Sequence, residues 1–195
     1  MRITLKSDTI RPDLQKKIKA LSRPRSVYEA GAKAVQKGIS AHLKKLQARG
    51  NEMGWPSQGF FAGSKNSVEK NVGISKLTDQ GAIITIADPR FVHRITGGTV
   101  RPKRRKFLAI PLTAAAYALA GQGSIRTSAP GLKVFGKRKL YLAVEKGDRI
   151  ELWFALVKSV THRPHPEDAP DEAVLAATAG SAMTRAADLL LEAKR

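Results

Sequence analysis

Residues 26–50 read SVYEAGAKAVQKGISAHLKKLQARG, and their apolar positions have the spacing of an α-helix. Successive positions are three or four residues apart, as one face of a helix requires; they are Tyr28, Ala32, Val35, Ile39, Leu43 and Leu46. Ser26 is a suitable amino-terminal cap, and Gly50 can end the helix. About six turns give a length of roughly 33 Å. A helix of this length typically lies across a sheet.

Strand-like segments follow this helix along most of the chain. Alternating or continuous apolar residues predict strands at residues 72–77, 82–87, 107–111, 132–135, 140–145 and 149–160. A turn at residues 78–81 would join the first two strands, and Asp88-Pro89 would stop the second. Both faces of residues 149–160 are apolar in the middle of the segment. This strand is therefore predicted to lie inside the sheet.

A second long helix is predicted over residues 170–194, after a proline-stiffened linker at 162–166. Its apolar stripe consists of small or aliphatic residues: Leu175, Ala179, Ala182, Ala186 and Leu189. Small side chains along a helix permit close approach to a sheet or to another helix. Helices at both ends with antiparallel strands between them predict an α+β fold. The expected fold is a mainly antiparallel sheet packed by the long N-terminal helix and the C-terminal helix.

We expect residues 1–195 to form a single α+β domain with several accessory segments. Residues 1–26 would be an N-terminal arm with a short edge strand and a short helix. Residues 50–67 and 97–106 would be extended loops. An Ala-rich stretch from Thr113 to Ala120 predicts one or two helical turns, and the Gly-containing segment 121–131 predicts a mobile loop.

The chain is strongly basic for a folding sequence. Its 195 residues contain 35 Lys+Arg against 16 Asp+Glu, a net charge of +19, with 42% hydrophobic residues. Residues 1–160 carry a net +21 and residues 161–195 a net −2. The acidic tail could pack on the basic body of another copy, or an Ala-rich helix could have collected acidic residues without such a role. A basic surface of this kind attracts polyanions or acidic protein faces.

Composition also excludes several classes of protein. The absence of cysteine excludes a disulfide framework, a thiolate zinc site, an iron–sulfur cluster and a cysteine nucleophile. No apolar run approaches the roughly 18 residues that span a bilayer, and the first residues lack the apolar segment of a secretory signal. We expect a soluble protein of a reducing compartment, with no contact to a membrane.

The histidines do not form a recognisable metal or catalytic motif. His162 and His165 have a metal-like spacing, but they lie on the Pro-rich linker and no third ligand accompanies them. His42 lies on the polar side of the long helix, where a surface role is expected. His93 is interpreted as a structural residue and not as a general base. No metal ligand and no cofactor is predicted.

The acidic residues also fail to form a catalytic group. A metal-dependent nuclease needs several carboxylates around Mg²⁺, whereas Glu69, Asp79 and Asp88 are isolated in a basic context. Glu145, Asp148 and Glu151 fall around one turn, which predicts a solvated turn. The sequence contains no nucleophile elbow, P-loop or dinucleotide-binding motif. We therefore expect no catalytic residues and no enzymatic activity.

Two loops between predicted strands concentrate the positive charge. The first contains Arg101, Lys103, Arg104, Arg105 and Lys106, and the second contains Lys137, Arg138 and Lys139. Both could project from one edge of the sheet and contact phosphates, which need only point charges. They could equally face an acidic protein partner, or serve solubility alone. No base-reading motif is present, so sequence-specific recognition of nucleic acid is not expected.

The loop at residues 50–67 is unusually aromatic. It contains Trp55, Phe60 and Phe61 among four glycines and a proline. Clustered aromatic residues in a loop indicate that they pack against something. They could cover the protein's own core, or they could dock onto a neighbouring subunit.

Several phrases of the sequence resemble one protein family. Gly97-Gly98-Thr99-Val100-Arg101-Pro102-Lys103 followed by Phe107-Leu108-Ala109-Ile110-Pro111-Leu112 resembles the Gly-Gly-Thr hairpin of tail-completion and minor tail proteins of tailed bacteriophages, the virion-morphogenesis group. Residues 87–93 are similar to the strand end that leads into that hairpin. Residues 54–61 look like the family's loop after its long helix, and residues 153–166 like its last strand and proline-marked turn. The hairpin residues would be Gly97, Gly98, Thr99 and Pro102.

The resemblance implies a structural virion protein at the head–tail junction, in the tail or neck of the virion after assembly in the host cytoplasm. It implies a ring homo-oligomer, with six copies expected. Other partners would be neck and tail proteins such as connector, stopper or tail-tube subunits. Residues 50–67 and 97–106 would reach neighbouring subunits, and basic side chains in the channel would contact phage DNA without reading its sequence.

Two rival functions remain open at this level. One is a non-specific nucleic-acid-binding protein, which predicts tight and steeply salt-dependent binding to any duplex. The other is a morphogenesis endonuclease, which predicts Mg²⁺-dependent nicking that requires Asp79, Asp88 or Glu145.

Overall fold

The computed structural model describes residues 15, 18, 19, 22, 24–50, 53–55, 58–120 and 131–192. The expected edge strand near residue 4, most of the expected short helix before residue 22, and the expected loop at 121–130 lie outside these residues. The described residues form helices and antiparallel sheets, with long helices toward both ends of the chain. The predicted α+β class is confirmed.

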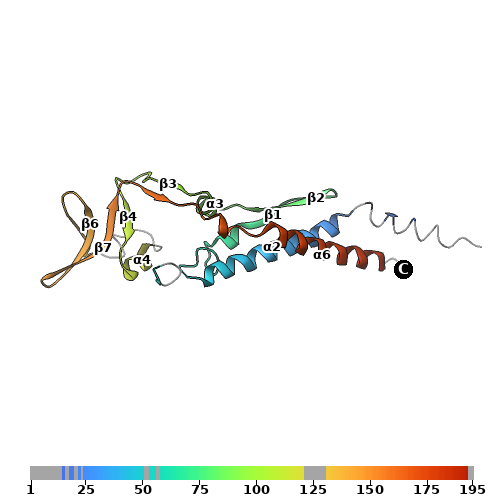
Figure 1. Cartoon of the computed structure of the whole chain (residues 1–195), viewed down its shortest axis with the longest axis horizontal. Helices are drawn as coiled ribbons and strands as arrows, with labels where there is room; N and C mark the ends of the chain where they lie inside the picture. Colours follow the sequence, from blue (N-terminus) through green and yellow to red (C-terminus); the bar gives the residue numbers. More distant parts are fainter. Residues whose placement is uncertain are drawn as a thin grey trace, which may run out of the picture. The chain divides into compact units, whose positions relative to one another are not determined.

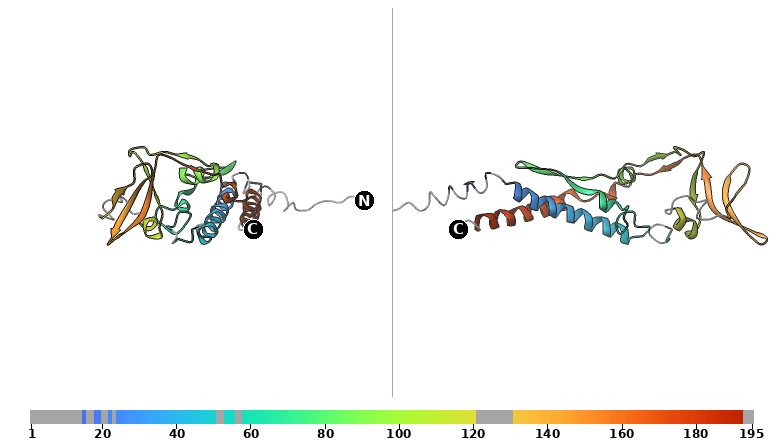
Figure 2. Two further views of the ribbon diagram at one scale, coloured as in Figure 1. Left: turned by 60° about the vertical axis from the view of Figure 1, so that its left-hand side comes forward. Right: turned by 180° about the vertical axis from the view of Figure 1, so that it is seen from behind.

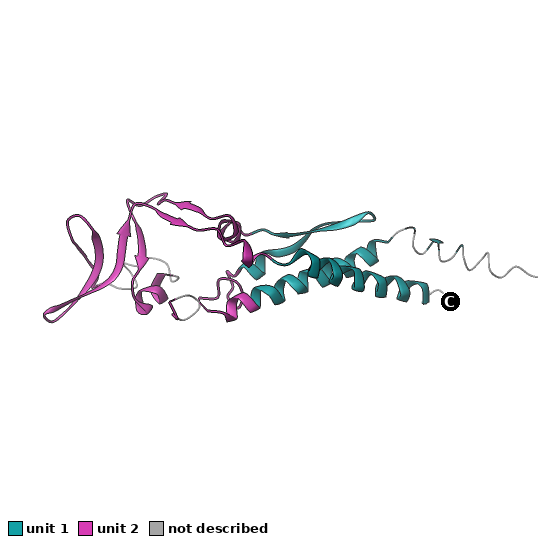
Figure 3. Cartoon of the chain, viewed as in Figure 1, with its two compact units in different colours: residues 1–44, 68–87, 170–195 teal, residues 45–67, 88–169 magenta. Residues whose placement is uncertain are grey.

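The chain divides into two compact units, coloured separately in Figure 3. Unit 1 comprises residues 1–44, 68–87 and 170–195, and unit 2 comprises residues 45–67 and 88–169. Each unit is assembled from segments that are distant in the sequence. The expectation of a single domain stays a prediction.

The described residues of unit 1 form two long helices and one β-hairpin. Helix α2 spans Arg25–Ala48, with its last four residues in unit 2, and α6 spans Glu172–Glu192. The 3-10 turn η1 (Val68–Asn71) leads into strands β1 (Val72–Thr78) and β2 (Gly81–Ile86). The hairpin runs along one side of α2 and α6 along the other (Figures 1 and 2). The predicted turn between the two strands is confirmed.

The predicted long helix is confirmed, with a correction at its beginning. The Tyr28 amide donates to the Pro24 carbonyl at 3.0 Å, so α2 begins at Arg25 and Ser26 lies within the first turn instead of capping it. Gly50 follows the helix with φ of +74°, a conformation that glycine adopts readily. The apolar stripe faces inward as expected, since Ala32, Ile39 and Leu43 are buried.

Glycines allow α6 to approach α2 closely. A Cβ atom on Gly31 would lie 2.7 Å from Met183 Cγ, and one on Gly38 would lie 2.9 Å from Leu175 Cδ2. These two glycines are seven residues apart and therefore share one face of α2. The predicted close approach of the last helix is confirmed, and its neighbour is a helix. No residue of α6 is fully buried, so much of this apolar helix remains accessible to solvent.

Unit 2 contains two antiparallel sheets. The larger has the strand order β4-β7-β6-β5, formed by β4 (Leu108–Pro111), β5 (Lys133–Phe135), β6 (Leu140–Lys146) and β7 (Arg149–Val157). The smaller pairs β3 (Gly98–Val100) with β8 (Val160–His162). Strand β7 lies inside the larger sheet, as predicted. The predicted strand at 149–160 divides into β7 and β8.

The expected Gly-Gly-Thr hairpin at residues 97–111 is not formed. Strand β3 pairs with β8, whereas β4 pairs with β7 in the other sheet. The two segments therefore find partners late in the chain instead of pairing with each other. Five basic residues and Pro102 lie between them, and proline cannot donate a hydrogen bond to a strand partner.

Residues 89–96 also differ from the expected strand end. They form the helix α3 (Pro89–Thr96), because Asp88 accepts a hydrogen bond from the Arg90 amide at 2.9 Å and Pro89 occupies the first helical position. The sequence Asp88-Pro89 does stop the preceding strand, as predicted. It does so by beginning a helix.

Two shorter helical segments also lie among the described residues of unit 2. Helix α4 (Ala114–Ala120) confirms the predicted Ala-rich turns, and Thr113 caps it through a bond from the Ala116 amide at 3.1 Å. The 3-10 turn η2 (Pro166–Asp168) follows β8. None of the described helices combines the length and apolar character needed to cross a membrane.

Candidate functional site

The first basic loop follows β3 and precedes β4. Its five cationic residues are all exposed: Arg101, Lys103, Arg104, Arg105 and Lys106. None of the five forms an ion pair with any described residue, and Lys106 lies 5.8 Å from the centre of the Phe107 ring. The loop therefore presents five uncompensated charges to solvent.

The second basic loop lies at the same end of the larger sheet. Strands β4 and β6 both run antiparallel to β7, and their first residues pair with neighbouring positions: Leu108 with Val157 and Leu140 with Leu156. The exposed residues Lys137, Arg138 and Lys139 immediately precede β6. The two loops therefore enter the sheet at the same end, one on each side of β7.

Strand pairing also fixes both ends of the first loop. Val100 pairs with Val160 and Leu108 pairs with Val157, so residues 101–107 connect two points that flank Lys158. We name this end of the sheet the basic end. Its nine exposed cationic residues are Arg101, Lys103, Arg104, Arg105, Lys106, Lys137, Arg138, Lys139 and Lys158. The sequence suggested that the two basic loops could project from one edge of the sheet, and the strand register brings both loops to one end of it.

Acidic residues lie at the opposite end of this sheet. Residues 89–144 contain no Asp or Glu. Near the turn between β6 and β7, Lys133 pairs with Glu145 at 2.5 Å and Lys146 pairs with Glu151 at 2.7 Å. A hydrogen bond from Lys146 holds the pKa of Glu151 below its ordinary value. One end of the sheet thus has compensated charges and the other does not.

A hollow of about 410 Å³ opens at the basic end. Its walls are the apolar or aromatic residues Phe107, Leu140, Tyr141, Ala155, Leu156 and Val157, and its rim carries Arg138, Lys139 and Lys158. All six wall residues are half-buried. The sequence did not predict this hollow, because it forms only where β6 pairs with β7 beside Phe107.

The aromatic loop contacts the chain's own side chains. The Trp55 ring lies 5.4 Å from that of Tyr117, and Phe60 lies 4.8 Å from Phe61. Phe61 in turn lies 6.5 Å from the buried Phe91, with the rings edge to face. This geometry favours the interpretation that the aromatic residues cover the core of unit 2. Docking onto a neighbouring subunit stays a prediction.

Two buried carboxylates organise the segments around α3. Asp88 is 2% exposed and binds Arg90, with Nη2 and Oδ2 2.6 Å apart. Hydrogen bonding to Asp88 raises the pKa of Arg90 above its ordinary value. Asp168 is 5% exposed and accepts from Arg94 Nε at 2.8 Å, with Arg49 at 3.8 Å. These pairs tie α3 to η2 and to the end of α2.

The histidines of unit 2 contact different partners. The ring of His93 meets that of His162 edge to face at 5.4 Å, whereas His165 Nδ1 lies 2.9 Å from Glu167 Oε1. His162 and His165 are thus engaged by different partners. Across the described residues, no three His, Asp or Glu side chains are grouped as a metal site would require.

Of the three carboxylates expected for a nuclease, two belong to ion pairs in unit 2 and the third lies in unit 1. Asp88 caps α3 and binds Arg90, and Glu145 pairs with Lys133 across the sheet. Asp79 lies in the hairpin turn of unit 1. Asp88 and Glu145 thus serve structural pairs in the described fold.

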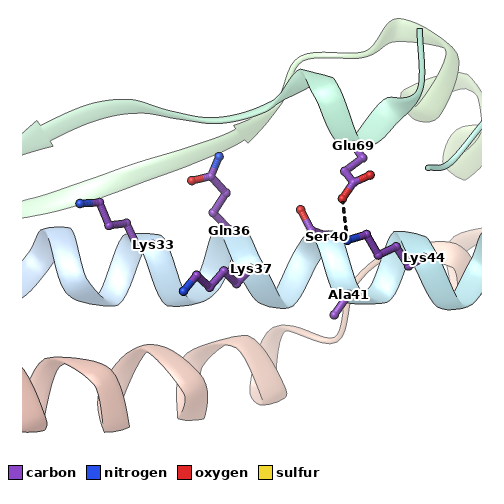
Figure 4. Close-up of a pocket in the computed structure, with 7 residues that line it drawn as sticks. All are labelled: Lys33, Gln36, Lys37, Ser40, Ala41, Lys44 and Glu69. Carbon is purple, nitrogen blue, oxygen red and sulfur yellow. Dashed lines mark ion pairs between the residues drawn. The ribbon is translucent and has the colours of Figure 1, made fainter. Parts of the chain in front are cut away.

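A third cationic surface lies in unit 1, between α2 and η1 (Figure 4). A hollow of about 430 Å³ is lined by Lys33, Gln36, Lys37, Ser40, Ala41, Lys44 and Glu69. Lys44 pairs with Glu69 at 3.4 Å, and Lys33 pairs with Glu29 at 2.6 Å. Because two of its three lysines are compensated, this surface carries less uncompensated charge than the basic end.

Comparison with known proteins adds nothing to these observations. No family model, no curated protein and no solved structure matches the chain. The basic end can bind anionic groups through point charges, and its hollow can accept apolar side chains.

Proposed function

We propose that this chain is a structural virion protein of a tailed phage, a tail-completion or head–tail connector subunit of the neck. The observation that carries the proposal is the basic end, where nine exposed cations from three segments meet on a rigid sheet. A surface of this kind suits assembly against an acidic face beside DNA. The sequence of residues 97–112 resembles virion-morphogenesis proteins, although its two strands pair with β8 and β7 instead of with each other.

In this function the protein works by assembly and not by catalysis. A closed ring of head-to-tail contacts requires two unlike, complementary surfaces on each subunit. The basic end and the acidic segment that follows residue 160 would provide such a pair. Ring copies, expected to number six, would contact connector, stopper or tail-tube subunits, and DNA in the channel would meet the cations without being read.

The decisive experiment replaces Arg101, Lys103, Arg104 and Arg105 with serine. The variant should fold, because all four side chains are exposed and unpaired among the described residues. Heads and tails should form but fail to join, as counted by electron microscopy of lysates. The matched control replaces Lys65, Lys70, Lys76 and Arg185, which are also exposed, and removes the same charge elsewhere. A normal virion yield from the first variant would sink the proposal.

The same cations also favour a second function, a non-specific nucleic-acid-binding protein. That function predicts that the isolated protein binds any duplex tightly, with an affinity that falls steeply as salt rises. The neck function predicts weak binding to DNA, together with rings visible in negative stain. Flanking portal, capsid or tail-tube genes would favour the neck function.

A further inference from the structure

The hollow at the basic end is unlike a surface built for phosphate alone. A phosphate contact needs only a cation that reaches the backbone. Here the cationic rim of Arg138, Lys139 and Lys158 surrounds apolar walls that include Phe107 and Leu156. Those walls are partly open to solvent, and covering apolar surface contributes about 25 cal/mol for each Å² removed from water.

The charge around the hollow is uniform in sign. None of the residues that line it is acidic, and its three rim cations form no ion pair within the described part of the chain. The five cations of the first basic loop approach the same end through the pairing of β4 with β7. An occupant must therefore supply the negative charge, and to cover the walls it must also supply apolar side chains.

We propose that the hollow binds a segment of a partner protein in which acidic and apolar side chains alternate. The apolar side chains enter between Phe107, Leu140 and Leu156, while the carboxylates meet the rim cations. Charge complementarity sets the orientation of the segment and its rate of association, and the apolar contacts supply affinity. The inference rests on the proposed function, in which this end of the sheet meets a neighbouring neck protein.

The test compares two probes on the full-length protein at one ionic strength. One probe is a short synthetic peptide of alternating glutamate and leucine, and the other is a duplex DNA of mixed sequence. The first variant is Phe107→Ser, which lies before β4 and outside any strand. The second is Leu140→Thr, which keeps a strand-forming residue at the beginning of β6.

The apolar and the charge-removing variants should affect the affinities for the two probes differently. Each apolar variant should weaken peptide binding by about ten-fold, the change that about 1.4 kcal/mol produces, and should leave DNA affinity unchanged. Replacing Arg138 and Lys158 with serine should weaken the binding of both probes. The control, Lys133→Ser at the opposite end of the sheet, should weaken neither by a comparable factor.

Two results would overturn the inference. The first is unchanged peptide affinity in both apolar variants. The second is binding of DNA tighter than that of the peptide, which would assign the surface to nucleic acid. If either occurs while the four-serine variant still blocks joining of heads to tails, only the inference fails. Peptide binding that depends on Phe107 in a protein dispensable for joining would instead overturn the proposed function alone.

Discussion

Units 1 and 2 bury apolar residues to the same extent but differ in their buried polar groups. Six buried apolar residues are described in each unit. The four buried polar or charged residues described, Ser67, Asp88, His165 and Asp168, all lie in unit 2. Long regular elements stabilise one another through apolar contact in unit 1, whereas irregular segments in unit 2 are joined by hydrogen-bonded carboxylates.

This difference indicates which interactions the stability of each unit depends on. Long helices and hairpins satisfy most of their own backbone groups, so unit 1 depends mainly on packing between its elements, such as that of α2 against α6. Unit 2 contains short elements that are separated by loops, and its buried carboxylates supply specific connections between them. Such connections are sensitive to the loss of either partner, because a buried charge without a partner is strongly unfavourable.

Breaking the Arg94–Asp168 pair should have the largest effect. Arg94→Ala removes the 2.8 Å partner of the buried Asp168 while Arg49 stays at 3.8 Å, and should lower the free energy of unfolding by about 3 kcal/mol, the lower end of the range for a broken buried pair. Trp55 and Trp153 both lie in unit 2, so tryptophan fluorescence during urea unfolding measures this loss. Arg94→Lys keeps the charge and should lose less. A loss below about 1 kcal/mol would show that the pair behaves as a surface ion pair.

Filling the contact between α2 and α6 should have an intermediate effect. Gly31→Ala places a methyl group 2.7 Å from Met183 Cγ, and should cost about 1–3 kcal/mol through overpacking. The matched control is Gly180→Ala on α6, where a Cβ atom meets nothing within 4 Å. Gly180→Ala should stabilise by up to about 1 kcal/mol, because alanine favours the helix more than glycine does.

Circular dichroism of the helices should record this pair of changes. Adding Met183→Ala to Gly31→Ala should restore part of the lost stability, because it removes the clashing side chain. Equal effects of Gly31→Ala and Gly180→Ala would mean that the two helices do not pack through Gly31.

Titration of exposed carboxylates should have the smallest effect in either unit. Hydrogen bonds from Lys33 and from Lys146 lower the pKa values of Glu29 and Glu151 below 4.5. A carboxylate whose pKa is lower in the folded protein than in the unfolded chain stabilises the folded protein at pH values above its unfolded pKa. This stabilisation disappears as the pH falls through the lowered, folded-state pKa. Both groups are exposed, so the change in melting temperature should be slight.

NMR titration of the carboxyl groups can measure the pKa values of Glu29 and Glu151 separately. Lys33→Gln should raise only the pKa of Glu29, in unit 1, and Lys146→Gln only that of Glu151, in unit 2. A shift of both pKa values by one variant would contradict the assignment of each carboxylate to its own lysine.

The elements of unit 1 could be predicted because their signals are local. The stripe from Ala32 to Leu46 repeats at helical spacing, and the alternation in residues 72–86 with a central turn predicts a hairpin. The misplaced beginning of α2 is a difference of one or two residues, which is common at helix ends. Local periodicity was enough because these elements satisfy their own hydrogen bonds.

Unit 2 resisted prediction because its partners are distant in the sequence. Thr99 bonds Thr161 across 62 positions, and Arg94 bonds Asp168 across 74. Nothing near Gly98 indicates that its strand will pair with β8, so a local hairpin was the simpler and incorrect expectation. The helix α3 could have been found, since Asp88 followed by Pro89 is a helix-start signal.

The candidate site divides in the same way. The basic residues at 101–106 and 137–139 are evident in the sequence, because charge is a property of single residues. Their meeting beside Lys158 depends on the pairing of both β4 and β6 with β7. The apolar hollow depends on the same register and has no counterpart in any one segment.

The long helices, the hairpin at residues 72–86, the α+β class and the basic character of the chain could all be predicted from the amino-acid sequence. These follow from side-chain periodicity and from charge, which act over a few residues. The partners of β3 and β4, the carboxylate–arginine pairs and the cluster of cations around an apolar hollow became evident only in the folded protein. Each of these features requires contact between segments that are distant in the sequence. The free energy of such contacts depends on residues in both segments, so no local sequence pattern indicates it.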